Sequence, residues 1–121
     1  MRTTLRTIVL AGVAGLAVTV PSACTKTAAA TSPAATVHMS EFSYSPKSVS
    51  VPKNAKVLVE NDGQVVHNWI IKGAGVGTAE VQPGATQVLD LGGIAPGTYT
   101  VFCDRPGHAA AGQTGSLTIA P

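Results

Sequence analysis

The segment KVLVENDG, residues 56–63, shows the pattern that decides the fold class. Side chains alternate between the two faces of a β-strand, so Val57, Val59 and Asn61 would share one face. Leu58 and Glu60 would then share the opposite face. The Asn-Asp-Gly step that follows is a turn sequence, because these residue types tolerate backbone conformations that others avoid. The segment therefore predicts a β-strand that ends in a turn.

The same pattern repeats on both sides of this segment, from residue 36 to residue 121. Short runs rich in Val, Ile, Thr and Tyr alternate with Pro, Gly, Asn and Asp, and no stretch has a convincing helical period. We predict strands at residues 36–44, 48–51, 56–61, 67–71, 87–91, 98–103 and 116–120. About seven short strands at this spacing predict an all-β fold, namely a Greek-key two-sheet β-sandwich.

The composition suits one compact domain. The chain is 45% hydrophobic and 12% charged, which favours a folded over a disordered chain. It has one Trp, two Tyr and two Phe, so the core must rely on aliphatic side chains. There is no basic stripe and no interleaving of basic with aromatic residues, which argues against nucleic-acid binding.

Residues 1–23 have the layout of a secretory signal peptide. Arg2 and Arg6 precede an apolar run of 14 residues at 7–20, which is short for a membrane-spanning helix. Small residues followed by Cys24 resemble a bacterial lipoprotein cleavage site, although Pro21 stands where Leu is usual. We therefore predict a lipidated Cys24 that anchors the protein to a membrane. Ordinary cleavage without lipidation and an uncleaved anchor remain alternatives.

Residues 24–35 follow as a tether rich in Ala, Thr, Ser and Pro, with a typical end-to-end distance of roughly 20 Å. The folded domain would then occupy residues 36–121. The whole chain has a formal charge of +2, and loss of Arg2 and Arg6 leaves six basic and six acidic residues. The processed protein would thus be about neutral.

One short loop gathers several possible metal donors. In CDRPGHAAAGQTG, residues 103–115, His108 lies five positions after Cys103, and Gln113 lies five positions after His108. Pro106 and Gly107 supply turn chemistry that would fold the loop back on itself. His67 lies 36 residues upstream, and the start of its strand could sit beside this loop in a sandwich.

A thiolate and two imidazoles in one plane suit copper in both oxidation states, and a weak fourth donor tunes the reduction potential. Zinc could occupy the same Cys/His/His set, although the affinity order favours Cu(II). A buried structural thiol at Cys103, or a disulfide between Cys103 and Cys24, is a further alternative for this cysteine.

The His67-Asn68-Trp69 step, together with Cys103, His108 and the Pro106-Gly107 pair before His108, resembles the cupredoxin or blue copper family. The loop is similar to that of azurin-, auracyanin-, rusticyanin- and sulfocyanin-like members. The resemblance implies one type 1 copper ion bound by His67, Cys103 and His108. Gln113 stands where the family usually has an axial Met, and stellacyanin-like members use Gln there.

The resemblance also implies roles around the ligands. The side chain of Asn68 would bond Asp104 and tie the two ligand segments together, and such contacts orient metal ligands. We expect a monomeric electron carrier rather than an enzyme, with a redox protein docking near His108. Export to the periplasm or the cell surface, with a lipid anchor in a bacterial membrane, would follow from the first 24 residues.

Two other functions use the same ligands. A periplasmic copper carrier or delivery protein would pass the metal, rather than an electron, to a partner. A small copper enzyme would need an open coordination position, and Asp104 is the one general base near the loop.

Overall fold

The computed structural model describes residue 12, residue 15 and residues 32–121. Nearly all of the predicted signal peptide, Cys24 and most of the predicted tether therefore lie outside the described residues. The described part of the chain contains strands and turns, without any helix long and apolar enough to cross a membrane. Its strands are β1 (Ala35–Ser40), β2 (Ser43–Ser45), β3 (Ser48–Val51), β4 (Lys56–Asn61), β5 (Ile70–Ile71), β6 (Val76–Gly77), β7 (Thr86–Asp90), β8 (Gly97–Phe102) and β9 (Thr114–Ile119).

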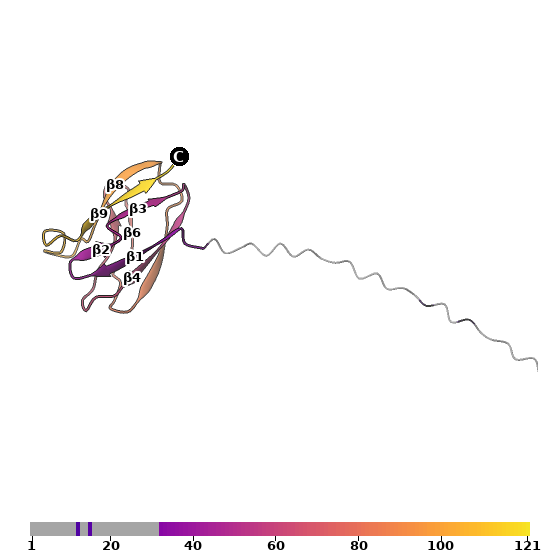
Figure 1. Ribbon diagram of the computed structural model, residues 1–121, viewed down its shortest axis with the longest axis horizontal. Coiled ribbons are helices and arrows are strands. Elements are labelled where there is room, and N and C mark those ends of the chain that lie inside the picture. Colours follow the sequence, from indigo (N-terminus) through magenta and orange to yellow (C-terminus); the bar gives the residue numbers. More distant parts are fainter. Residues whose placement is uncertain (1–11, 13–14, 16–31) are drawn as a thin grey trace, which may run out of the picture.

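The strands form two facing sheets (Figure 1). One has the order β2-β1-β4-β7, and the other has the order β3-β9-β8-β5-β6. Two pairs are parallel, β1 with β4 and β3 with β9, and the other pairs are antiparallel. The chain crosses between the sheets five times, as the two strand orders show. The predicted all-β two-sheet sandwich is confirmed.

Two predicted strands differ locally from the observed ones, and β6 has no predicted counterpart. The predicted strand at 36–44 is a hairpin, because a turn at Glu41 and Phe42 folds β2 back along β1. The predicted strand at 67–71 is regular only at Ile70–Ile71, since the N–H of Trp69 donates to the Oγ1 of Thr78 rather than to a neighbouring strand. His67 keeps one isolated bridge, to Val81.

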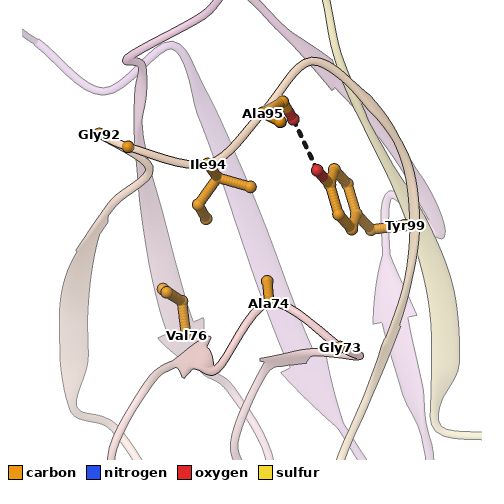
Figure 2. A pocket seen from close by; sticks show the side chains of 8 residues that line it. Gly73, Ala74, Val76, Gly92, Ile94, Ala95 and Tyr99 are labelled. Atoms are coloured by element: carbon orange, nitrogen blue, oxygen red, sulfur yellow. Dashed lines mark hydrogen bonds between the residues drawn. The ribbon is translucent and has the colours of Figure 1, made fainter.

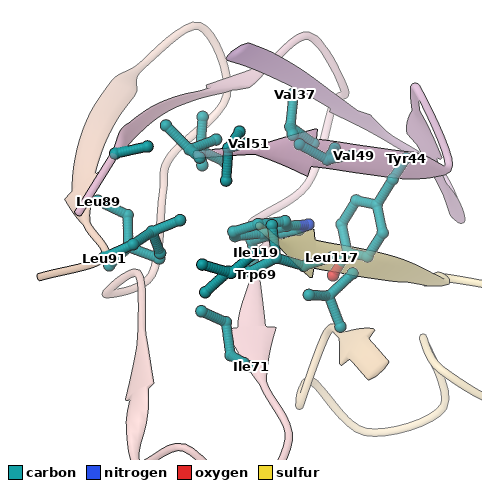
Figure 3. Packing of buried hydrophobic residues seen from close by; sticks show 14 of the residues in the cluster. Val37, Tyr44, Val49, Val51, Trp69, Ile71, Leu89, Leu91, Leu117 and Ile119 are labelled. Atoms are coloured by element: carbon teal, nitrogen blue, oxygen red, sulfur yellow. The ribbon is translucent and has the colours of Figure 1, made fainter. Parts of the chain in front are cut away.

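The core lies between the sheets and is mostly aliphatic, as the composition predicts. Trp69 is fully buried among side chains of both sheets, and Figure 3 shows it beside Ile71, Leu117 and Ile119. The alternation that predicted β4 is also observed, because Val57, Val59 and Asn61 are buried while Leu58 and Glu60 are partly exposed. The remaining core side chains come from both sheets, among them Val37, Met39, Val49, Val51, Leu89, Leu91 and Val101.

Candidate metal centre

The loop between β8 and β9 brings together the donors that the sequence predicted there. Cys103 follows the last residue of β8, and its N–H donates to the carbonyl of Gln113 at 3.1 Å. The N–H of Gln113 donates in turn to the carbonyl of His108, also at 3.1 Å. Gly107 has φ of 81°, a conformation that glycine adopts without steric cost. Loop closure thus places Cys103, His108 and Gln113 side by side.

His67 reaches the same point from a different segment of the chain. Its backbone bridge to Val81 fixes the segment, and its side chain is fully buried. The Nδ1 atoms of His67 and His108 are 3.2 Å apart, and the Sγ of Cys103 is 3.5 Å from Nδ1 of His108. One ligand atom from each of these three residues lies within 4.8 Å of the other two. The three predicted donors therefore converge.

The spacing of the donors fits a single ion. Imidazole nitrogens bind metals such as zinc at about 2.0–2.1 Å, so two nitrogens that share one ion must lie within about twice that distance. The 3.2 Å between the two Nδ1 atoms meets this condition. Cys103 is 1% exposed, so its sulfur is shielded from water, while His108 is only partly buried.

Gln113 supplies a fourth candidate donor. Its side chain is fully buried, and its Nε2 donates to the carbonyl of Ser40 at 3.2 Å. Its Oε1 is the one buried side-chain oxygen or nitrogen, among the described residues, that has no hydrogen-bond partner. Leaving a buried carbonyl oxygen unpaired costs about 1–3 kcal/mol. A metal ion within reach of this oxygen would give it a partner.

Asn68 connects the two ligand segments, as the sequence resemblance implied. Its Nδ2 donates to Oδ1 of Asp104 at 2.5 Å, and its Oδ1 accepts the N–H of Asp104 at 3.0 Å. The carbonyl of Asn68 accepts a 2.6 Å bond from the hydroxyl of Tyr44. Burial raises the pKa of Tyr44 well above its usual range, with a smaller contribution from the charge of Cys103. These bonds hold the residues beside His67 and Cys103 in a fixed relation.

Glu41, in the turn between β1 and β2, was not singled out from the sequence. Its Oε1 accepts the N–H of Gln64 at 2.6 Å and that of Val65 at 3.0 Å, and lies 3.2 Å from Nε2 of His67. The N–H groups of Val65 and Gln64 lower the pKa of Glu41 to about 2. No motif or spacing marks this contact, because Glu41 and His67 are 26 residues apart and meet only in the folded chain.

Two other features of the described chain lie outside this centre. His38, Glu60 and Asp62 form a solvent-accessible cluster on the outer face of one sheet. A pocket of about 270 Å³ lies between the β5–β6 turn and the β7–β8 loop (Figure 2). Small and apolar residues and Tyr99 line this pocket, and none of the four predicted donors does.

The donor chemistry favours copper over other metals. A thiolate and two imidazoles with a weak oxygen donor are typical of blue-copper electron-transfer sites. Hard cations such as magnesium or calcium prefer a set of oxygen ligands, which the centre does not offer. The residues present therefore fit one copper ion.

Comparison with known proteins agrees with this assignment. The Cupredoxin-like domain family matches residues 10–119. Auracyanin-B of Chloroflexus aurantiacus is 26% identical in a match that covers 66% of this chain and 48% of that protein. This chain thus spans about half the length of that curated relative.

Solved structures point to the same fold. Reduced auracyanin from Roseiflexus castenholzii is similar with a TM-score of 0.64 and 24% identity, over 72% of this chain and 96% of that one. A structure of auracyanin B has a TM-score of 0.58 and 27% identity, over 74% of this chain and 91% of that one. Because the family match covers nearly all of the chain, the protein belongs to the cupredoxin-like family.

Proposed function

We propose that the protein carries single electrons between redox partners through one type 1 copper ion. The observation that carries the proposal is the convergence of Cys103, His67 and His108, whose ligand atoms lie within 4.8 Å of one another. His67, Cys103 and His108 would hold the ion, and Oε1 of Gln113 would be its weak fourth donor. Bound copper supplies the one-electron couple, and the ligand types suit both of its oxidation states.

The chain's own residues would keep the ligands in place during electron transfer. His67 and Cys103 are buried, and the bonds between Asn68 and Asp104 connect their two segments. A site that moves little when its charge changes has a small reorganisation cost, which favours fast transfer. His108 is only partly buried, so its ring is the route by which an electron would reach the surface.

The surface around His108 suits a partner that binds weakly. Phe42 is 40% exposed, and the ring centroids of Phe42 and His108 are 4.9 Å apart. Ala109, Ala110 and Ala111 follow His108 in the loop. A small apolar surface of this kind supports a transient redox complex with little electrostatic steering. The protein would act as a monomer.

We also propose that the protein is exported and lipid-anchored. Residues 1–23 would be removed as a signal peptide, and Cys24 would carry the lipid. The tether at 24–35 would then hold the domain close to a bacterial membrane. The intact mass of the protein from the membrane fraction would test this, because an unmodified Cys24 in the processed chain rules out the anchor.

Titration of the purified metal-free protein with Cu(II) tests the central proposal. We expect an intense visible thiolate-to-copper absorption band at one copper per protein, absent in Cys103→Ser. His38→Gln is the matched control, because His38 is an exposed histidine outside the centre and its loss should leave the band intact. A wild-type protein that binds copper without this band would contradict the proposal.

Two further measurements separate electron transfer from the alternative functions. Slow electron self-exchange combined with rapid copper transfer to an acceptor protein would favour a copper carrier. A copper spectrum that changes on addition of azide would favour an enzyme with an open coordination position. We expect fast self-exchange, retained copper and a spectrum that azide leaves unchanged.

A further inference from the structure

Three consecutive residues, Ser40 at the end of β1 and Glu41 and Phe42 in the turn that follows, contact three of the four proposed ligands. The carbonyl of Ser40 accepts from Nε2 of Gln113, and the ring of Phe42 meets that of His108 edge-on at an interplanar angle of 74°. Between them, Oε1 of Glu41 lies 3.2 Å from Nε2 of His67. The turn belongs to neither ligand segment, so it contacts the centre from a third part of the chain.

The carboxylate of Glu41 is held in place independently of His67. The N–H groups of Gln64 and Val65 both donate to the oxygen that faces the imidazole. Gly63 leaves room for this approach, because a Cβ atom there would overlap the same carboxylate oxygen. These two bonds therefore fix the position of Oε1 beside the buried ring of His67.

This contact determines which nitrogen of His67 carries its proton. A carboxylate only accepts hydrogen bonds, so Nε2 of His67 must be the protonated nitrogen of the neutral ring. Nδ1 is then left with a free lone pair, and it is Nδ1 that lies 3.2 Å from Nδ1 of His108. A metal-binding histidine whose other ring nitrogen donates to a carboxylate is held in its tautomer and orientation, and becomes a stronger donor.

The charge of Glu41 also acts on the bound ion. Its side chain is 33% exposed, whereas His67 is fully buried, so the carboxylate lies at the boundary between solvent and the centre. Among the carboxylates described, Glu41 is the one in contact with a proposed ligand ring, since Asp104 bonds Asn68 instead. A negative charge there favours the more positive oxidation state of the ion, and this lowers the reduction potential.

We propose that Glu41 is a positioning residue of the metal centre, which holds His67 as the tautomer with a free Nδ1 and lowers the reduction potential of the bound copper. The effect of Glu41 on the reduction potential rests on the proposed copper function. Its effect on the tautomer of His67 concerns the metal-free protein and does not rest on that function.

Two substitutions separate the hydrogen bond from the charge. Glu41→Gln keeps a side-chain oxygen that can accept from Nε2 of His67 but removes the charge, and Glu41→Ala removes both. Glu60→Gln is the matched control, because it makes the same charge change on the outer face of the sheet beside His38. Thermal unfolding of each variant establishes that it is folded.

The first readout is the tautomer of His67 in the metal-free protein, measured by NMR with ¹⁵N-labelled histidine. We expect the Nε2–H tautomer in the wild type, in Glu41→Gln and in Glu60→Gln. In Glu41→Ala we expect a mixture or the Nδ1–H tautomer. An unchanged tautomer in folded Glu41→Ala would overturn the positioning role, whatever metal the protein binds.

The second readout uses the copper-loaded protein. We expect Glu41→Gln and Glu41→Ala to raise the reduction potential above that of the wild type and of Glu60→Gln. Loss of such a partner typically weakens metal affinity by about 10–100-fold, so Glu41→Ala should also lose copper to a chelator more readily than Glu41→Gln does. An unchanged potential in Glu41→Gln would overturn the electrostatic role. A wild type without a thiolate-to-copper band would refute the copper function but leave the tautomer result standing.

Discussion

Substitution of Asn61 tests how the chain supports the segment that leads to His67. Asn61 is the last residue of β4 and is 1% exposed. Its Nδ2 donates to the carbonyls of Val65 and Val81, both at 2.8 Å, and its Oδ1 accepts the N–H of Gly63 at 2.9 Å. One buried amide thus connects the turn after β4 to Val81, the bridge partner of His67.

The three bonds set the expected magnitude for Asn61→Ala. Each hydrogen bond contributes about 0.5–1.5 kcal/mol net. The substitution removes all three, and the bonds to Val81 and Gly63 are buried. We expect a loss of about 2–4 kcal/mol in the free energy of unfolding. A domain of this size loses about 4–8 °C in Tm for each kcal/mol, so its Tm should fall by roughly 8–32 °C.

Asn61→Asp distinguishes the lost bonds from lost volume. Aspartate has nearly the same shape, but it replaces the donor that serves Val65 and Val81 with an oxygen that cannot donate when ionised. We expect it to destabilise the protein at neutral pH at least as much as Asn61→Ala does. Gln64→Ala is the control, since Gln64 is exposed and its substitution should change stability by no more than about 0.5 kcal/mol.

Urea and thermal unfolding of the metal-free protein measure these differences without a contribution from bound copper. A loss of less than about 1 kcal/mol in Asn61→Ala would refute the argument. So would an Asn61→Asp variant as stable as the wild type, because the amide donor would then contribute nothing.

Three other substitutions have expected outcomes. Gln113→Met should raise the reduction potential of the copper-loaded protein, because a thioether stabilises Cu(II) less than an amide oxygen does; an unchanged or lower potential would contradict an axial Gln113. Burial raises the pKa of Tyr44 above the value of 10.0 that it has in the unfolded chain. The contribution of this shift to the free energy of unfolding is therefore fully present below pH 10.0, and it is lost as the pH rises from 10.0 towards the pKa in the folded protein. Tyr44→Phe should therefore make stability less dependent on pH in alkaline urea unfolding, and an identical dependence would argue against the buried hydroxyl. Gly115→Ala should cost about 1–3 kcal/mol or more in thermal unfolding, because its Cβ would overlap the carbonyl oxygen of Lys47, and an unchanged Tm would contradict this close approach.

Most of the fold and the metal centre could be predicted because their signals are local. The alternation in residues 56–61 predicts a half-buried strand without reference to any other segment of the chain, and β4 has these bounds. The loop of Cys103, His108 and Gln113 carries its own turn residues, and its closure requires no distant partner. The hairpin at 36–44 was not anticipated, because no Gly or Pro marks the turn at Glu41 and Phe42.

By itself, the sequence determined the all-β class, the loop of donors and their chemistry, because these depend on residue types at short separations. Only the tertiary structure decided that His67 meets this loop, that Oε1 of Gln113 is buried without a hydrogen-bond partner, and that Glu41 contacts Nε2 of the His67 ring. The contacts of His67 with Glu41 and His108 join residues 26 and 41 positions apart, and they arise from the packing of two sheets rather than from any local pattern.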